Sequence, residues 1–457
     1  MNNLNNISID EYIFPSEPPK PAGKPLPPKP GERPEPLPKN SVWFTHDPAI
    51  YHDPVSNNYY IYGTGAECLK STDLISFERL GRVIEAPPKE SSDWVGGNAI
   101  WAPDIVKVGD EYRIYGSNST WGVRQSCIFL AVADNAEGPF IPRGAVLKTS
   151  EKLPVNAIDA NIVEDVETGE QYMTYGSFWG GCHILKLDKE TGLAANANPT
   201  TEEELIGKCI ARRPQWADCA IEGPYIIYNP DTEYYYLFVS YASLKSDYNI
   251  RVGRSKCITG PYYDHNGRDM TDINDTDNTL GYMIECGYAF KDCKPYMGPG
   301  HNSVLRDFDN NWYVICHIRE KNFKGGEAST MHIRKIVWTK DGWPCASPLQ
   351  YAGEQLQPVP KELVCRTFER ITLQPTIPQG IRHSTLMELK NDGSVLIQET
   401  IKGHWHFTDE YTIEISYGKT VETLTVLPGW DYELWKPCVV LTGINNNHIC
   451  VWGKAPL

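Results

Sequence analysis

Five segments of the chain repeat one plan: a polar residue opens a short apolar strand, a turn follows, and an aromatic-rich strand returns. HDPAIYHDPVSNNYYIYGTG and EGPYIIYNPDTEYYYLFVSY are two of the five. The opening residues lie between 55 and 79 positions apart, and a four-stranded propeller blade with its loops needs about 60 residues. The repeats therefore predict an all-β protein with a five-bladed β-propeller, and a β-sandwich is the alternative. The opening residues are Asp47, Asp104, Asp159, Glu222 and His301.

The repeats divide the chain into three regions, of which residues 41–355 are the predicted propeller. Residues 15–38 hold eleven of the 35 prolines, and proline at this density prevents helix and ladder hydrogen bonds. We therefore predict an extended arm at residues 1–40, which is a spacer, a strap on the domain or a docking ligand. Residues 356–457 alternate short apolar strands with turns such as NDG and GINNN, which predicts a small antiparallel β domain with a barrel-like shape.

Charge and composition narrow the class of protein. The chain carries 58 acidic and 43 basic side chains, a net charge of −15. Such a surface repels phosphate backbones and anionic lipids, so we predict no nucleic-acid and no membrane partner. The amino terminus MNNLNNISIDEYIF lacks the basic and apolar regions of a secretory signal, and thirteen cysteines fit a reducing compartment. The sequence thus predicts a cytoplasmic protein, or an extracellular one if a leader was removed.

The repeat also predicts a site. The first strand of each propeller blade lines the central axis, so the five opening residues are expected to converge at one end of the channel. Four carboxylates and an imidazole would then surround one funnel. Crowded carboxylates divide into protonated and ionised groups, and hydrolysis of a glycosidic bond needs one acid for the leaving oxygen and one base for water. We therefore predict a glycoside hydrolase; the alternative is that these acids only cap turns.

An ordered set of motifs across residues 44–350 resembles the arabinanase branch of glycoside hydrolase family 43. The motifs are THDPAI (45–50), WAPDI (101–105), NAIDANI (156–162), YGSFWGGCHILKLD (175–188), IEGPYI (221–226), GHNSV (301–305) and DGWP (341–344). The resemblance implies a five-bladed propeller enzyme that cleaves α-1,5-linked L-arabinan or arabino-oligosaccharides with inversion and no organic cofactor. An exo-acting α-L-arabinofuranosidase or β-xylosidase and a non-catalytic carbohydrate-binding propeller are the alternatives.

Carried over residue by residue, the resemblance implies three catalytic roles. Asp47, in HDP, would be the general base that activates water, and Glu222, in EGP, would be the general acid. Asp159, in AID, would hold the acid in position and raise its pKa. Inversion requires the two working carboxyl groups to lie about 6.5–9.5 Å apart, so that a water fits between them. No catalytic role follows for Asp104, which we expect to fix Trp101 and its loop.

His301 resembles a family histidine that faces a metal ion, usually calcium, in the axial channel. Calcium prefers six to eight oxygen ligands, so one imidazole with several waters would anchor it weakly. A fixed cation near the base would keep that carboxylate ionised. The resemblance therefore implies one calcium ion in the central channel, and a histidine bonded only to water is the alternative.

Residues beside the blade openings are candidate sugar contacts. Aromatic rings can pack on the C–H faces of a sugar, while amide and hydroxyl groups can bond its hydroxyls. Packing between blades is the alternative for Trp101 and Phe178, and bracing of the strand is the alternative for His46. We expect Trp216 and Trp312 to lie in the core. The candidate contacts are His46, Trp101, Asn161, Ser177, Phe178 and Trp179.

Overall fold

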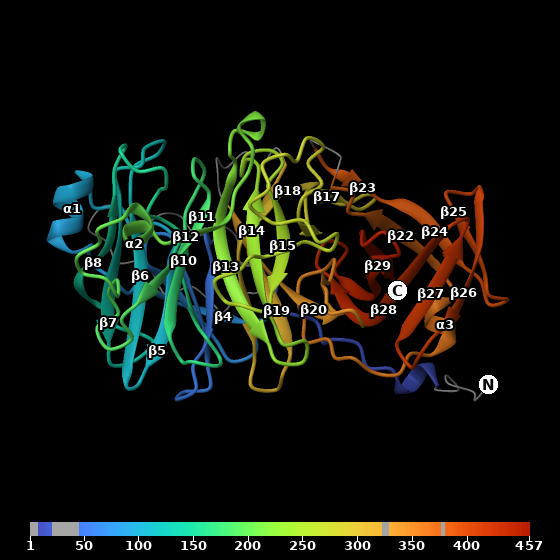
Figure 1. Cartoon of the computed structure of the whole chain (residues 1–457). Coiled ribbons are helices and arrows are strands. Elements are labelled where there is room, and N and C mark those ends of the chain that lie inside the picture. Colours follow the sequence, from blue (N-terminus) through green and yellow to red (C-terminus); the bar gives the residue numbers. More distant parts are fainter. Residues whose placement is uncertain (1–7, 21–44, 322–328, 376–379) are drawn as a thin grey trace.

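The computed structural model describes residues 8–20, 45–321, 329–375 and 380–457. Within these ranges, five β-sheets stand around one axis and a closed barrel follows them, as Figure 1 shows from the side. The predicted all-β class, the five-bladed propeller and the barrel-like C-terminal domain are confirmed, and the β-sandwich alternative is wrong.

The first four blades are four-stranded antiparallel sheets. Blade one holds β1 (Ala49–His52), β2 (Tyr59–Gly63), β3 (Glu67–Ser71) and β4 (Phe77–Arg82). Blade two holds β5 (Pro103–Val108), β6 (Glu111–Asn118), β7 (Ser126–Ala133) and β8 (Ile141–Thr149). Blade three holds β9 (Asn161–Glu164), β10 (Gln171–Tyr175), β11 (Cys182–Leu187) and β12 (Lys208–Ala211). Blade four holds β13 (Ile221–Asn229), β14 (Tyr234–Tyr241), β15 (Asn249–Ser255) and β16 (Tyr282–Glu285).

Blade five is a six-stranded sheet that also receives a strand from the C-terminal region. In sheet order it holds β21 (Pro344–Ala346), β20 (Thr330–Trp338), β19 (Trp312–Glu320), β18 (Tyr296–Arg306), β17 (Tyr288–Ala289) and β23 (Arg382–His383).

Short helices lie in the loops of the propeller: α1 (Lys89–Val95), α2 (Glu202–Ile206) and the 3-10 turn η2 (Gln215–Ala217). None of the helices in the described ranges is long and apolar enough to cross a bilayer.

Side chains alternate between the two faces of each strand, which lets one strand pack against both neighbouring blades. In β2, Tyr60 and Tyr62 pack in a cluster shared with blade two, whereas Ile61 between them packs against Leu305 and Ile315 of blade five. Successive side chains of a strand point to opposite faces, so one aromatic-rich strand serves two interfaces. The inner strands β1, β5, β9, β13 and β18 contact one another in a closed ring, which places the blade openings at one end of a common channel.

The C-terminal barrel has a filled interior. Eight strands leave a space just wide enough for side chains, and an apolar cluster that includes Phe368 and Trp405 occupies it. The short helix α3 (Lys361–Val364) adds Leu363 and Val364 to this cluster. The barrel strands are β22 (Thr367–Thr372), β24 (Thr385–Leu389), β25 (Ser394–Ile397), β26 (Ile401–Phe407), β27 (Thr412–Tyr417), β28 (Thr420–Asp431), β29 (Lys436–Asn445) and β30 (Cys450–Pro456).

The described part of the N-terminal region lies against the barrel, beside α3 in Figure 1. After η1 (Ile9–Glu11), the buried ring of Tyr12 joins the barrel cluster. Trp435 of the barrel donates its indole N–H to Glu17, at 2.6 Å. Residues 8–20 thus form a strap, and the rest of the predicted arm at 1–40 lies outside the described residues.

The barrel packs on blade five. The Trp452 indole N–H donates to the Ala346 carbonyl at 2.8 Å, and its ring meets that of Tyr288 edge-on, with centroids 5.5 Å apart. The barrel therefore supports the blade that carries His301.

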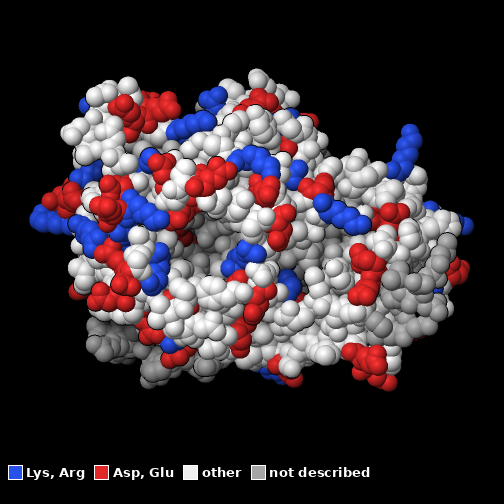
Figure 2. Space-filling view, turned by 60° about the horizontal axis from the view of Figure 1, so that its bottom comes forward, with Lys and Arg blue, Asp and Glu red and all other residues white. Residues whose placement is uncertain are grey.

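On the face seen in Figure 2, acidic and basic side chains are interspersed.

Candidate active site

The residues that open the blades meet at the end of the central channel. Asp47, Asp104, Asp159 and His301 line one small cavity of about 10 Å³, together with Gly223, which directly follows Glu222. The convergence predicted from the repeats is therefore present, although more than 250 positions separate the first and last of these residues in the sequence.

Three of the opening residues adopt strained backbone conformations. Asp47, Asp159 and His301 have φ angles of 52°, 63° and 45°, and a non-glycine residue in this region costs about 1–3 kcal/mol. Such strain persists only where the surroundings hold it, and it clusters at functional sites. The neighbouring blade supplies the support, because the hydroxyl group of Ser117 accepts the N–H of Asp159 at 2.9 Å and that of Ser240 accepts the N–H of His301 at 2.7 Å.

These supports belong to a ring of polar residues at the ends of the second strands. Each member forms a hydrogen bond with the opening residue of the next blade. The member in blade two bonds Asp159, the one in blade three Glu222, the one in blade four His301 and the one in blade five Asp47. The sequence analysis did not assign this ring. Its signal is the recurring Tyr-Gly-Thr or Tyr-Gly-Ser at the strand ends of the first three blades. The ring members are Ser117, Ser177, Ser240 and His317.

Asp47 is held as an ionised carboxylate. Its Oδ2 accepts a hydrogen bond from Thr64 Oγ1 at 2.6 Å, and its Oδ1 lies 3.2 Å from His301 Nδ1 and 3.4 Å from His317 Nδ1. Burial alone would raise the pKa of Asp47, but the charges of His301 and His46 hold that pKa well below its usual value. A buried carboxylate that stays ionised is suited to accept a proton from water.

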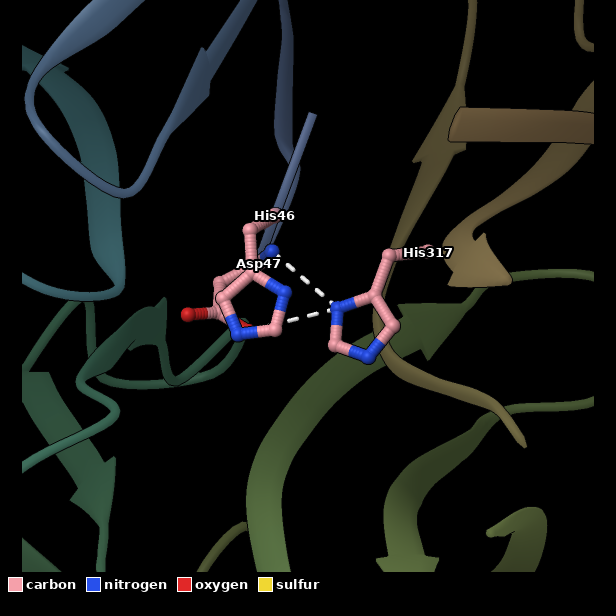
Figure 3. A group of neighbouring side chains, drawn as sticks. All are labelled: His46, Asp47 and His317. Atoms are coloured by element: carbon pink, nitrogen blue, oxygen red, sulfur yellow. Dashed lines mark hydrogen bonds and ion pairs between the residues drawn. The ribbon is translucent and has the colours of Figure 1, made fainter. Parts of the chain in front are cut away.

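The two histidines beside Asp47 brace it, as Figure 3 shows. The rings of His46 and His317 stack with centroids 4.3 Å apart and planes 11° apart. Burial, followed by the His46 charge, lowers the pKa of His317 to about 3, so its neutral ring accepts the Asp47 N–H at 3.2 Å. His46 Nδ1 lies 3.2 Å from the Ser329 hydroxyl group, so His46 braces the strand; its contact with sugar stays a prediction.

The ligand atoms of His46, Asp47 and His317 lie within 4.8 Å of one another, a spacing that could hold a metal ion. The ring geometry argues against this. Imidazole nitrogens bind a metal in the plane of the ring at about 2.0–2.1 Å, and two rings stacked face to face cannot both direct a nitrogen at one ion. We therefore assign this cluster to the support of Asp47.

Glu222, at the start of β13, is oriented by two hydroxyl donors. Tyr248 donates to Oε1 and Ser177 donates to Oε2, both at 2.8 Å. Burial, and then the Glu222 charge, raise the pKa of Tyr248 well above its usual value, so its hydroxyl group remains a donor. The Tyr248 ring also stacks on that of His317, with centroids 5.9 Å apart, which links the supports of Glu222 and Asp47. The sequence analysis missed Tyr248, because it lies in a loop outside every repeated motif.

Asp159 is the protonated counterpart of Asp47. Burial, and then the charges of Glu222 and Asp47, raise its pKa to about 8, although His301 lowers it. The backbone of Gly223 bonds to the Asp159 carboxyl group, so Asp159 lies beside the residue that follows Glu222. At neutral pH Asp47 is thus ionised and Asp159 protonated; the roles of Asp47 and Glu222 as base and acid stay predictions.

Asp104 ties blades together. Its Oδ2 accepts the backbone N–H of Ile162 at 2.7 Å and the amide of Asn161 at 3.1 Å, and Asn161 Oδ1 accepts the N–H of Ile226 at 2.8 Å. Blades two, three and four are joined by this pair. Asp104 is structural, as expected, but it fixes blade three where we expected Trp101. The surroundings of the buried Asn161 favour a structural role over the predicted sugar contact.

Two hollows open on either side of Phe178. The first, of about 700 Å³, is lined by Glu222, Phe178, Trp121 and Trp216. The second, of about 480 Å³, is lined by Phe178, Trp179 and Arg124. Phe178 and Asp218 line both hollows and form the ridge between them.

The aromatic predictions have mixed outcomes. Phe178 and Trp179 line these hollows, whereas Trp101 is half-buried and lines neither. Trp312 lies in the core at 5% exposure, as expected. The core position expected for Trp216 is wrong, because its side chain is 55% exposed in the wall of the first hollow. Sugar contacts of Phe178, Trp179, Trp101 and Ser177 stay predictions.

The axial cavity has donors that suit a hard cation. Asp47 supplies an ionised carboxylate at its wall and Asp159 a carboxyl group, and oxygens of these groups are ligands that calcium prefers. The buried Asn302 also lines the cavity, and neither polar atom of its side chain has a hydrogen-bond partner among the described residues. His301 adds one imidazole. This donor set fits the ion that the resemblance implies.

Comparison with known proteins gives matches over most of the chain. The family model described as "Glycosyl hydrolases family 43" matches residues 39–344, and that described as "C-terminal lipocalin-like domain" matches residues 348–453. The chain is 31% identical to an extracellular endo-alpha-(1->5)-L-arabinanase of Thermotoga petrophila, over 89% of this chain and 93% of that protein. It is 30% identical to the extracellular endo-alpha-(1->5)-L-arabinanase 2 of Bacillus subtilis, over 90% and 92%.

Solved structures agree with these matches. The structure of the endo-1,5-alpha-L-arabinanase from Thermotoga petrophila superposes with a TM-score of 0.80 at 29% identity, covering 91% of this chain and 99% of that one. The alpha-L-arabinanase of Cellvibrio cellulosa, solved with arabinohexaose, gives a TM-score of 0.56 at 26% identity and covers 66% and 95%.

Proposed function

Because this chain belongs to family 43 of the glycosyl hydrolases and is a glycosidase, we propose that it hydrolyses α-1,5-linked L-arabinan and arabino-oligosaccharides with inversion at the anomeric carbon. The observation that carries the proposal is the pairing of an ionised, histidine-braced Asp47 with a hydroxyl-bonded Glu222 at the mouth of one channel. The names of the two relatives that match about nine-tenths of this chain support arabinan as the substrate.

The mechanism divides the proton transfers between these two carboxyl groups. Glu222, in its protonated form, gives its proton to the glycosidic oxygen as the bond to the anomeric carbon breaks. Asp47 removes a proton from the water whose oxygen forms the new bond on the opposite face of the sugar. Each turnover leaves Asp47 protonated and Glu222 ionised, and exchange with solvent restores both. Asp159 remains beside the acid and positions it.

The alternatives find less support. A non-catalytic sugar-binding propeller would need only the aromatic surfaces and would have no use for Asp47, Asp159 and Glu222 together. An exo-acting α-L-arabinofuranosidase or β-xylosidase is less favoured, because the relatives that match both domains are named endo-arabinanases.

Incubation with linear 1,5-arabinan, with separation of the products by size over time, tests the proposal. We expect a ladder of fragments, whereas xylan-derived oligosaccharides remain uncut. Release of sugar from the xylan substrates alone would contradict the choice of substrate, and no release from either would favour the binding propeller.

We also propose that one calcium ion binds in the axial channel, held by His301 and by oxygen ligands at the wall of the cavity. Asp47, Asp159 and Asn302 are the groups that would face it. A bound cation would supply fixed positive charge beneath the carboxylates and would keep Asp47 ionised.

Removal of the ion is expected to destabilise the fold. A ligand present at 100 times its Kd lowers the free energy of the native state by about 2.7 kcal/mol, which corresponds to a fall in Tm of about 3–4 °C on chelation for a protein of this size. Calorimetry with EDTA, followed by added calcium, measures this shift, and added magnesium serves as the control ion. The variant His301→Ala should lose the response to calcium. An equal Tm with and without chelator would contradict the calcium site.

The location of the enzyme is a separate question, on which its relatives and its sequence differ. Both relatives are named extracellular, and these names do not support the cytoplasmic location expected from the sequence. That location stays a prediction, which fits an enzyme that trims imported arabino-oligosaccharides. Fractionation of the source cells, with activity measured in medium and cytosol, distinguishes the two locations.

A further inference from the structure

The exposed tryptophans of the propeller gather beside Glu222. Among the described residues, four tryptophan side chains are more than one-third exposed: Trp94 at 39%, Trp121 at 71%, Trp179 at 36% and Trp216 at 55%. Three of these four line the two hollows on either side of the Phe178 ridge, and Glu222 lines the first of these hollows. Clustered exposed aromatic surface in a concave wall marks a binding site.

We propose that Trp121 and Trp216 are stacking residues for sugar units in the first hollow, which Glu222 lines, and that a further unit is held near Trp179 across the Phe178 ridge. The inference rests on the proposed function and extends it: the cleft takes an internal stretch of an arabinan chain, with the cut at the Phe178 ridge. Trp121 and Trp216 would then determine the preference for long chains.

The first hollow joins loops of blades two and four. Trp121 comes from the loop between β6 and β7, and Lys245, from the loop between β14 and β15, has its Nζ 5.6 Å from the Trp121 ring. The Trp216 indole N–H donates to the Asp275 carbonyl at 2.8 Å, which fixes one edge of the ring and leaves its face at the hollow. Both rings can offer apolar faces to the C–H faces of a sugar.

The same wall contains a buried charged group. Arg213 is 6% exposed and lines the first hollow. It donates to the Ala220 carbonyl at 3.2 Å and to Asn278 Oδ1 at 2.6 Å. Aromatic faces together with a few fixed polar groups are the composition expected of a site for a small ligand with hydroxyl groups. A volume of about 700 Å³ is within the range of such sites.

The ridge between the hollows adjoins the acid and contains residues with a strained backbone. Phe178, Trp179 and Asp218 have φ angles of 53°, 37° and 54°, conformations that a chain adopts only where its surroundings hold them. The Phe178 N–H donates to the carbonyl of Ile221, the residue before Glu222, at 2.7 Å. A sugar chain that reaches the ridge from the first hollow therefore passes the acid, which lines that hollow.

The second hollow offers a different aromatic surface. The guanidinium carbon of Arg124 lies 5.4 Å from the centre of the Trp179 ring, a contact like that of Lys245 with the Trp121 ring. Trp179 is less exposed than Trp121 and Trp216. The stronger stacking positions thus lie in the first hollow, and loss of either tryptophan there should weaken the binding of long chains most.

Kinetics with linear 1,5-arabinan test the inference. We expect Trp121→Ala and Trp216→Ala to raise KM about 3- to 10-fold with kcat unchanged, as the loss of one stacking contact predicts, and Trp121→Phe to retain most of the wild-type affinity. Phe308→Ala is the matched control, because this ring is 56% exposed and lies in the turn at the far end of blade five. Thermal unfolding of each variant checks that the fold is intact.

The outcomes separate the two proposals. A KM within twofold of wild type for both alanine variants, or a fall in kcat at unchanged KM, would overturn the stacking role. Absence of arabinan cleavage by the wild-type enzyme would instead overturn the proposed function. A rise in KM for Phe308→Ala as large as that for the cleft variants would also count against the inference.

Discussion

Glu222→Gln is expected to lower kcat on linear arabinan by a factor of about 10²–10⁴, the usual contribution of a general acid. The amide has nearly the same shape as the carboxyl group but supplies no acidic proton to the departing sugar oxygen. Tyr248 and Ser177 can still bond to it, since each hydroxyl group can donate or accept. The sugar should therefore bind as before, and the loss should appear in kcat.

The leaving group provides an internal control for Glu222. A 4-nitrophenyl arabinofuranoside releases a stable phenolate and needs little proton donation, so the variant should lose much less activity on this substrate. Ser177→Ala and Tyr248→Phe remove one orienting hydroxyl group each and should cost less than the loss of the acid. Near-normal turnover of arabinan by Glu222→Gln would remove this residue from its role.

Asp47→Asn is the second substitution with a large expected effect. Asn cannot accept a proton from water, so kcat on arabinan should also fall by about 10²–10⁴. The shape of the side chain is kept, and Thr64 can still donate to its oxygen. Arabinan should therefore bind the variant with a Kd close to that of the wild-type enzyme.

Measurement of Kd and kcat together distinguishes catalysis from structure at Asp47. Calorimetric titration with arabino-oligosaccharide gives the affinity, and thermal unfolding shows whether the strained backbone at this position survives. Loss of binding together with loss of activity would identify Asp47 as a structural residue. Retained activity would show that another group activates the water.

The convergence of the blade openings could be predicted from the sequence because equivalent positions of the repeat occupy equivalent places in the blades. Each opening residue sits at the same place in its blade, so closure of the propeller brings Asp47, Asp159, Glu222 and His301 together however far apart they lie in the chain. Only some of the residues that support them could be predicted from the sequence. Ser117 and Ser177 follow a visible Tyr-Gly-Ser pattern, but His317 and Tyr248 break it.

The wall of the cleft could not be predicted, since loops of different blades build it. Trp121 and Lys245 meet across blades two and four, and the sequence of neither loop indicates that it contacts the other. Trp216 looked like a core residue because tryptophans of a propeller commonly pack between blades, yet its turn carries it to the surface. The barrel was readable from strand alternation, whereas the docking of Tyr12 in its interior depends on tertiary contacts.

The stereochemistry of the first product tests most directly whether Asp47 and Glu222 act as base and acid on opposite faces of the sugar. Proton NMR of the anomeric signals during early hydrolysis of α-1,5-arabino-oligosaccharide should show the β anomer at the newly formed reducing end, before mutarotation mixes the two forms. An α anomer formed first would mean retention, and therefore a covalent intermediate in place of direct attack by water.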